Sequence, residues 1–255
     1  MATSNTNALQ NTSGTIALAG AGKMGGAMLT GWLAGGLDAN RVIVVEPFPA
    51  DDIKALAAKG VRLNPKDAGT ADTLVVAVKP QMFREAGPAL KKLVGPGTLV
   101  VSIMAGTPIA VLEAVCGGMV VRAMPNTPAA IGRGITVAVA AKNVSAAQRA
   151  TADALLHATG SVEWVDDESL MDAVTAVSGS GPAYVFLLAE ELARAGVEAA
   201  GQPTGQHRAA HLAGAGQRDG AVEVCEGTSC GDRRRHATYS LVVPAKAGTH
   251  NHRRF

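Results

Sequence analysis

Short apolar runs alternate with helix-forming stretches over residues 14–165 of the chain. Fully apolar runs are typical of strands buried on both faces of a sheet, and helices between them are typical of parallel crossovers. The predicted strands are residues 15–19, 41–46, 61–63, 73–78, 98–103, 119–123 and 135–139. The predicted helices cover about 24–33, 51–59, 83–93 and 145–158, and another begins near residue 107. The pattern therefore predicts an α/β domain with a doubly wound parallel sheet.

Local signals mark several helix ends. Gly60 follows the second predicted helix, where a glycine commonly closes a helix. Thr107 and Pro108 predict a helix start, with Thr107 at the N-cap and Pro108 in the first turn. Ser145, followed three residues later by Gln148, predicts a capping box.

A helical segment follows the predicted sheet. Residues 167–177 predict one helix, Ser178–Gly181 predicts a break, and residues 182–195 predict a second helix. The second helix is apolar nearly all round, so we expect it to be buried against the rest of the chain or a partner chain. Beyond Gly201 only residues 239–243 resemble a strand.

Charge and composition divide the chain near residue 202. Residues 203–255 contain seven Arg and one Lys against four acids, a balance of +4, whereas residues 1–202 have a balance of −2. We therefore expect four parts. These are a disordered leader at 1–13, the sheet domain at 14–165, the start of a helical domain at 166–201, and an irregular tail at 202–255 that is disordered or out of frame.

Composition also excludes several classes of protein. Hydrophobic residues make up 47% of the chain, which excludes a chain disordered throughout. No apolar stretch approaches the roughly 20 residues of a membrane span, and residues 1–14 do not resemble a secretory signal. We expect a cytoplasmic protein with no membrane partner. The three cysteines lack metal-ligand spacing, so no metal site is predicted, and the arginines at 233–235 lack the aromatic neighbours of a nucleic-acid site.

The strongest candidate site is the glycine motif Gly20-Ala21-Gly22-Lys23-Met24-Gly25, between the first predicted strand and helix. In a dinucleotide-binding turn the first glycine permits the tight turn, the second lets a pyrophosphate approach, and the third allows close packing. The helix start adds free N–H groups and the positive end of the helix dipole. We expect this motif to bind a dinucleotide; a tight turn without a ligand is the alternative.

Glu46 ends the second predicted strand, 21 residues after Gly25. A carboxylate in this place accepts hydrogen bonds from the adenosine ribose hydroxyls and repels a 2′-phosphate. No Lys or Arg follows before Lys54. The residues therefore favour NADH over NADPH, and a solvated acid at the strand end is the alternative.

Further candidate contacts follow later strands. Val78-Lys79-Pro80 ends the fourth strand and Ala105-Gly106 follows the fifth. Ligands of doubly wound folds bind outside the carboxyl ends of strands, so both loops are candidate cofactor contacts, although ordinary strand endings have the same composition. Asn126 lies in a turn between two prolines and hydrogen-bonds either a ligand or its own main chain. Ser178-Gly179-Ser180-Gly181 precedes a helix that starts with proline and predicts an anion pocket for a substrate carboxylate, with a flexible hinge as the alternative.

Together these residues resemble pyrroline-5-carboxylate reductase, the last enzyme of proline synthesis, over about residues 15–201. The resemblance rests on five motifs in order, at residues 20–25, 77–80, 102–106, 122–128 and 178–183. It implies an N-terminal Rossmann domain that binds NAD(P)H through residues 20–25 and the loops at 78–80 and 105–106. Because the family more often uses NADPH, both NADP and NAD remain open as cofactors.

The resemblance also implies the reaction, which is hydride transfer to the C=N carbon of 1-pyrroline-5-carboxylate to give L-proline. A protonated imine is already a good hydride acceptor, so we expect no general acid and assign no catalytic side chain. The substrate site is implied beside Ser178-Gly179-Ser180-Gly181. Family members are homo-oligomers whose C-terminal helices interlock.

The sequence departs from the family after Gly201. Neither the further helices of the family nor its Ser-Pro-Gly-Gly-Thr-type loop is recognisable there, so we expect this chain to lack the interface helices. Two functions stay open: an active reductase and an inactive remnant that still binds a dinucleotide. A related reductase of β-hydroxyacids or imines is disfavoured, because residues 167–195 contain no Lys.

Overall fold

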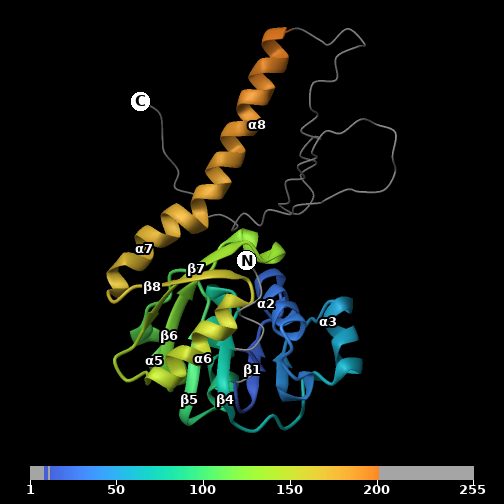
Figure 1. Cartoon of the computed structure of the whole chain (residues 1–255), viewed down its shortest axis with the longest axis vertical. Coiled ribbons are helices and arrows are strands. Elements are labelled where there is room, and N and C mark those ends of the chain that lie inside the picture. Colours follow the sequence, from blue (N-terminus) through green and yellow to red (C-terminus); the bar gives the residue numbers. More distant parts are fainter. Residues whose placement is uncertain (1–8, 11, 201–255) are drawn as a thin grey trace. The chain divides into compact units, whose positions relative to one another are not determined.

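The computed structural model describes residues 9, 10 and 12–200 (Figure 1). The described residues do not include most of the leader predicted at 1–13. They also do not include the tail predicted at 202–255, with its predicted strand at 239–243. Within the predicted leader, Leu9 is buried in the core. The contacts divide the chain into two units, Met1–Gly179 and Ser180–Phe255.

An eight-stranded sheet forms the centre of the first unit (Figure 1). The strands are β1 (Ile16–Ala19), β2 (Val42–Val45), β3 (Arg62–Leu63), β4 (Ala71–Val76), β5 (Val94–Ser102), β6 (Met119–Met124), β7 (Gly134–Ala140) and β8 (Gly160–Trp164). Their order across the sheet is β3-β2-β1-β4-β5-β6-β7-β8. The direction in which the chain adds strands reverses between β1 and β4, which makes this place the topological switch point of the sheet.

The predicted doubly wound sheet is confirmed, with one correction to its direction. The first six strands are parallel, but β7 runs antiparallel to β6, with Arg122 opposite Val139. β8, which pairs parallel with β7, was not among the predicted strands. It lies at the edge of the sheet and alternates half-buried with exposed residues, so it lacks the continuous apolar run of the central strands.

Helices cover both faces of the sheet (Figure 1). The helices of the first unit up to β8 are α2 (Lys23–Ala34), α3 (Asp51–Leu56), α4 (Phe83–Lys91), α5 (Ile109–Cys116) and α6 (Ala146–His157). Because successive strand side chains point to opposite faces, Ile16 and Leu18 pack with α2 and α6, whereas Ala17 and Ala19 pack with α4 and α5. The buried Trp32 indole N–H of α2 donates to the Leu155 carbonyl of α6 at 2.8 Å.

Two of the three predicted helix-end signals are confirmed. Gly60 closes the turn after α3 with φ of 105°, and Ser145 and Gln148 form the capping box of α6. The N-cap predicted at Thr107 is wrong, since Pro108 takes that position and Thr107 makes no cap. The Ile109 N–H instead donates to Glu168 Oε1 at 2.8 Å, so a carboxylate distant in sequence accepts from the helix start.

Helical turns follow β8 at the end of the first unit. They are the 3-10 turn η5 (Glu168–Leu170), the short helix α7 (Met171–Val174) and a π-helical turn, η6 (Thr175–Ser180), whose last residue belongs to the second unit. The break predicted at Ser178–Gly181 is therefore wrong, because the wider π turn keeps the backbone helical across these small residues. The Ser178 hydroxyl donates to the Val174 carbonyl at 2.9 Å within this turn.

The described part of the second unit consists of Ser180 and α8 (Gly181–Ala200). Its large apolar side chains are exposed in the described chain, including Tyr184 at 67% and Leu192 at 64%. Arg194 pairs with Glu191 at 3.2 Å on the same helix. Among the described residues, no helix combines the length and the apolar character that crossing a bilayer requires.

Candidate functional site

The predicted cofactor residues meet at one edge of the sheet. Glu46 follows β2, the glycine motif follows β1, and the loops at 78–80 and 105–106 follow β4 and β5. Asn126 follows β6. These five strands are consecutive neighbours and run parallel, so the sheet brings their carboxyl ends together on both sides of the switch point.

The glycine motif has the three local geometries that its sequence predicts. Gly20 has φ of 91°, and a Cβ there would lie 2.6 Å from the Ala77 carbonyl oxygen of the loop after β4. A Cβ at Gly25 would overlap the Gly20 carbonyl oxygen and lie 3.1 Å from Ala77 Cβ. At Gly22 a Cβ would meet nothing within 4 Å. The turn is thus packed at its first and third glycines and open at the second.

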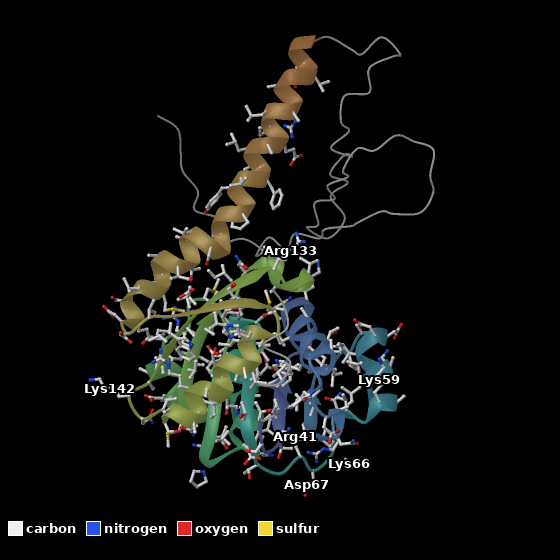
Figure 2. The ribbon with its side chains drawn as sticks, in the orientation of Figure 1. Arg41, Lys59, Lys66, Asp67, Arg133 and Lys142 are labelled. Atoms are coloured by element: carbon white, nitrogen blue, oxygen red, sulfur yellow. The ribbon has the colours of Figure 1, made fainter. Side chains whose placement is uncertain are left out.

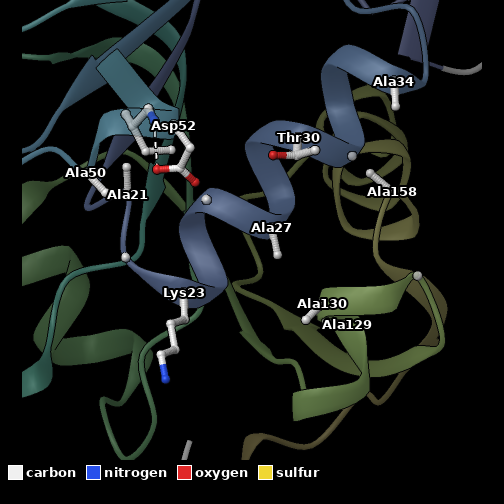
Figure 3. A pocket seen from close by; sticks show the side chains of 15 residues that line it. Ala21, Lys23, Ala27, Thr30, Ala34, Ala50, Asp52, Ala129, Ala130 and Ala158 are labelled. Atoms are coloured by element: carbon white, nitrogen blue, oxygen red, sulfur yellow. Dashed lines mark hydrogen bonds between the residues drawn. The ribbon is translucent and has the colours of Figure 1, made fainter. Parts of the chain in front are cut away.

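The open glycine lies at the start of α2, where a cavity of about 650 Å³ begins (Figure 3). Gly22 is the N-cap and makes no side-chain cap hydrogen bond, so the first turn presents backbone N–H groups that the helix itself cannot satisfy. A diphosphate suits these donors and the positive end of the helix dipole. The residues present therefore fit a dinucleotide. The cavity is lined by Ala21, Gly22, Lys23, Gly26, Ala27, Thr30, Gly31, Ala34, Ala50, Asp52, Ile53, Ala129, Ala130, Gly132 and Ala158.

Glu46 is hydrogen-bonded to the glycine turn and is not a free surface acid. Its Oε2 accepts from the Ala21 N–H at 2.8 Å, and its Oε1 accepts from the Phe48 N–H at 3.1 Å. The carboxylate is half-buried and joins the loop after β2 to the loop after β1. Each oxygen still has a lone pair for a further donor.

Asn64 positions Glu46 and was missed by the sequence analysis. The Glu46 N–H donates to Asn64 Oδ1 at 2.9 Å, and Asn64 Nδ2 donates to the Glu46 carbonyl at 2.8 Å. Asn64 is the only non-glycine residue with positive φ, 46°, among the described residues. The Asn64-Pro65 dipeptide is a turn signal that marks the position, although it does not reveal the partner.

The loops after β4 and β5 border the glycine turn. A Cβ at Gly20 would lie 3.0 Å from the Val78 nitrogen, which places Val78-Lys79-Pro80 beside that turn. The Ile103 N–H donates to the Val76 carbonyl at 3.0 Å and holds the next loop alongside. Gly106 has φ of 66° and open space around its Cβ position.

Asn126 hydrogen-bonds its own main chain. Its Oδ1 accepts from the Ile135 N–H at 2.9 Å, which closes the turn between β6 and β7. This is the main-chain alternative of the sequence analysis. Its side-chain NH₂ group is free of this hydrogen bond and is the group through which a contact to the cofactor stays predicted.

The predicted substrate residues divide between the two units. Ser178 and Gly179 lie in the π turn, and a Cβ at Gly179 would lie 2.6 Å from Met124 Cε at the end of β6. Ser178 and Gly179 thus lie near the carboxyl edge that carries Asn126. Ser180 and Gly181 belong to the second unit.

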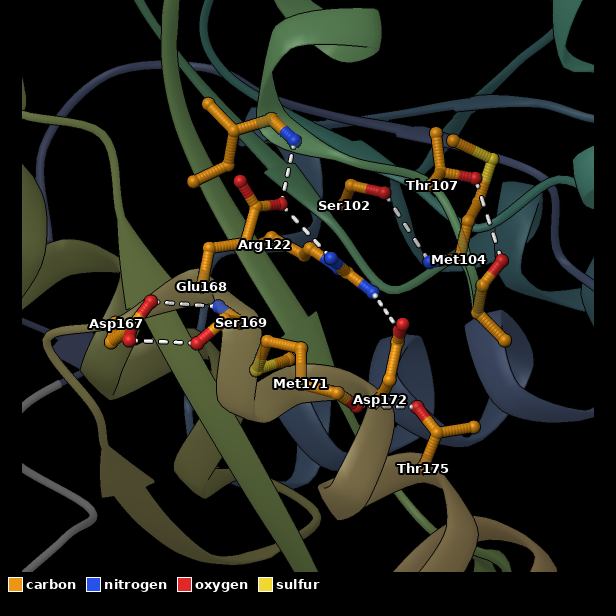
Figure 4. A network of polar contacts seen from close by, with 12 residues as sticks. Ser102, Met104, Thr107, Arg122, Asp167, Glu168, Ser169, Met171, Asp172 and Thr175 are labelled. Atoms are coloured by element: carbon orange, nitrogen blue, oxygen red, sulfur yellow. Dashed lines mark hydrogen bonds and ion pairs between the residues drawn. The ribbon is translucent and has the colours of Figure 1, made fainter.

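A buried arginine fastens the helical turns to the sheet (Figure 4). Arg122 of β6 is 6% exposed at its side chain and pairs with Glu168 at 2.9 Å. Glu168 Oε1 also accepts from the Ile109 N–H, so one carboxylate joins β6, α5 and η5. Asp172 adds a longer contact to Arg122 at 3.5 Å. In the sequence analysis Arg122 belongs only to the motif at residues 122–128. Its place inside an otherwise apolar predicted strand, 119–123, is the signal for a buried cation that needs an acidic partner.

Three ionisable side chains in the described part of the chain have shifted pKa values, each with a structural cause. Hydrogen bonds from the Ser169 side chain and backbone lower the pKa of Asp167 next to this network. Hydrogen bonds from the Asn40 backbone and side chain lower the pKa of Asp38. Burial raises the pKa of the Cys116 thiol to about 11, so it stays protonated and unreactive in the core. Among the described residues, no group of His, Cys, Asp and Glu side chains is arranged to hold a metal ion.

Two family models match the chain. Residues 15–106 match the model described as NADP oxidoreductase coenzyme F420-dependent, and residues 168–229 match the model described as Pyrroline-5-carboxylate reductase dimerisation. The second match continues past Gly201, where the resemblance in the sequence analysis ends.

Individual proteins give the same assignment. The pyrroline-5-carboxylate reductase of Pseudomonas aeruginosa is 43% identical over 186 residues, which cover 71% of this chain and 68% of that relative. The solved structure of a pyrroline-5-carboxylate reductase from Coxiella burnetii has a TM-score of 0.65 and 33% identity, over 73% of this chain and 72% of that one. The Plasmodium falciparum pyrroline carboxylate reductase, solved with NADP bound, has a TM-score of 0.60 and 29% identity, over 73% and 70%. This chain belongs to the pyrroline-5-carboxylate reductase family.

Proposed function

We propose that the chain reduces 1-pyrroline-5-carboxylate to L-proline with NAD(P)H. The observation on which the proposal rests is the open N-terminus of α2 at Gly22, placed at the switch point beside the loops after β4 and β5. Family membership gives the reaction class. When bound, the dihydronicotinamide supplies a hydride to the C=N carbon of the substrate.

The residues of this chain bind and orient the reactants. The backbone N–H groups at Gly22 and the first turn of α2 hold the diphosphate, and Glu46 accepts from the adenosine ribose. Val78-Lys79-Pro80 and Ala105-Gly106 would contact the nicotinamide end of the cofactor, and Asn126, which follows β6, would contact it through its side-chain NH₂ group. The gain in rate comes from orientation and exclusion of water, so no side chain is assigned as a general acid.

The substrate carboxylate is assigned to Ser178-Gly179-Ser180-Gly181. Because the backbone is helical there, the free N–H groups expected from the sequence are replaced by the Ser178 hydroxyl, which donates to the substrate carboxylate in place of the Val174 carbonyl. The position of Gly179 against Met124 supports a substrate site at the carboxyl edge.

We propose a homo-oligomer in which α8 contributes to the interface. The dimerisation model matches residues 168–229, and the apolar side chains of α8 are exposed in a single chain. The domain boundaries at 165 and 201, the cytoplasmic location and the missing interface helices stay predictions.

A direct spectrophotometric assay tests the function. Purified full chain is mixed with 1-pyrroline-5-carboxylate and NADH or NADPH, absorbance at 340 nm is followed, and L-proline is identified by mass spectrometry. We expect substrate-dependent oxidation of the nucleotide with an equal amount of proline. Saturable nucleotide binding without turnover would refute the proposal in favour of the inactive remnant, an alternative that the comparisons do not support.

A further inference from the structure

Two acids lie beside the start of the cavity at the glycine motif. Glu46 follows β2 and accepts from the N–H of Ala21, which lines the cavity, and Asp52 in the first turn of α3 lines it too (Figure 3). Asp51 precedes Asp52 in the first turn of α3. A ligand group placed between β2 and α3 therefore meets negative charge.

Among the described residues, no hydrogen bond or ion pair joins the carboxylate of Glu46 or Asp52 to a Lys or Arg. Lys54 pairs with Asp51 at 2.8 Å. Arg62 lies opposite Ile43 in the sheet, three residues before Glu46. In Figure 3 the Lys23 side chain points away from Ala50 and Asp52.

Two more cations lie at the other end of the sheet. Figure 2 places Arg41 and Lys66 at the edge where β2 begins, opposite the carboxyl ends of the strands. Arg41 Nε donates to the Gly14 carbonyl at 2.8 Å in this place. Among the described residues, the loop from Glu46 to Ala50 itself contains no Lys or Arg that could receive a phosphate.

Glu46 is also held rigidly. Asn64, in the left-handed region, makes two hydrogen bonds with the Glu46 backbone, and the carboxylate accepts from the Ala21 and Phe48 N–H groups. A left-handed non-glycine residue is retained where the surrounding structure requires it. The carboxylate cannot swing away from a group bound beside it without losing both acceptor contacts.

We infer that Glu46, positioned by Asn64, makes this chain select a nucleotide with a free ribose 2′-hydroxyl, NADH, against one with a 2′-phosphate, NADPH. The inference rests on the proposed function and departs from the NADP-bound Plasmodium falciparum relative. A free 2′-hydroxyl donates to the carboxylate, whereas a phosphate dianion at that place faces Glu46 and Asp52. Lys23, the one cation among the described residues that line the cavity, points away from Asp52 (Figure 3).

Calorimetric binding of ADP-ribose and 2′-phospho-ADP-ribose to the full chain tests this without turnover. We expect ADP-ribose to bind at least about tenfold more tightly. Glu46→Gln, which keeps an acceptor and removes the charge, should reduce that ratio about tenfold. Glu163→Gln, the same change at an exposed acid on β8, should leave the ratio unchanged.

Asn64→Gly tests the positioning role. Glycine accepts the positive φ and removes both side-chain hydrogen bonds, so the affinity ratio should fall while ADP-ribose still binds. A lowered melting temperature with an unchanged ratio would overturn the role of Asn64. Equal or tighter binding of 2′-phospho-ADP-ribose by the unmodified chain, or an unchanged ratio in Glu46→Gln, would overturn the inference for Glu46. If neither probe binds, the proposed dinucleotide function fails as well.

Discussion

Alanine substitutions in the glycine motif should separate nucleotide binding from folding. At Gly22 the new Cβ meets nothing within 4 Å and the backbone, with φ of −69°, accepts alanine. The weaker N-cap preference of alanine costs up to about 1 kcal/mol, and the loss of unfolded-chain freedom offsets about 0.4–1 kcal/mol of it. The free energy of unfolding should therefore change by less than about 1 kcal/mol.

The methyl group that Gly22→Ala adds nevertheless occupies the space through which a diphosphate approaches the backbone. We expect Gly22→Ala to weaken ADP-ribose binding at least about tenfold, which corresponds to about 1.4 kcal/mol. Gly97→Ala is the matched control, because Gly97 also has open space around its Cβ position but lies in β5. Gly97→Ala should leave both the affinity for ADP-ribose and the melting temperature nearly unchanged.

Gly25→Ala should have the opposite outcome. Its Cβ would overlap the Gly20 carbonyl oxygen, a backbone atom that cannot rotate aside as a side chain can. Overpacking of this kind costs about 1–3 kcal/mol. At about 2–4 °C per kcal/mol for a unit of this size, the melting temperature should fall by about 2–12 °C.

Two measurements check the set: thermal unfolding by circular dichroism and ADP-ribose binding by calorimetry. The reasoning is refuted if Gly22→Ala binds ADP-ribose as tightly as the unmodified chain while Gly97→Ala does too. It is also refuted if Gly25→Ala melts at the unchanged temperature, because the packing assigned to the third glycine would then be wrong.

Further expected outcomes concern the ion pairs of Arg122, the capping box at Ser145 and the buried thiol of Cys116. Glu168→Ala leaves buried Arg122 without its main partner and should lower the free energy of unfolding in urea by about 3 kcal/mol. Asp172→Ala, at a 90% exposed carboxylate, should lower it by less than about 1 kcal/mol. Equal effects of the two variants would contradict the assignment of Glu168 as the main partner of Arg122. Ser145→Ala should cost about 1 kcal/mol in the same assay through loss of the capping box, and no loss would argue against it. Peptide mapping after iodoacetamide treatment at pH 8 should find Cys116 unmodified in the folded chain and modified in urea, since burial raises its pKa to about 11; rapid modification of the folded chain would refute this.

Much of the first unit follows from local patterns in the sequence. The central strands are continuous apolar runs because both faces of a parallel sheet are covered, and the structure places seven strands where such runs predict them. The three roles of Gly20, Gly22 and Gly25 are likewise local, since each concerns backbone shape within one turn. The sequence by itself therefore determined the doubly wound architecture and the order of loops along its carboxyl edge.

Tertiary structure alone decided the features that join segments distant in sequence. Glu168 replaces Thr107 as the acceptor at the start of α5, Asn64 holds the backbone of Glu46, and β7 reverses direction against β6. None of these has a periodic or local signal, because each is a hydrogen-bond pairing between elements whose proximity exists only once the sheet has formed. The same reason explains the helical backbone at Ser178–Gly181, where composition predicts a break between two helices. In the structure a π-helical turn spans Thr175–Ser180, and Gly179 packs against Met124 there.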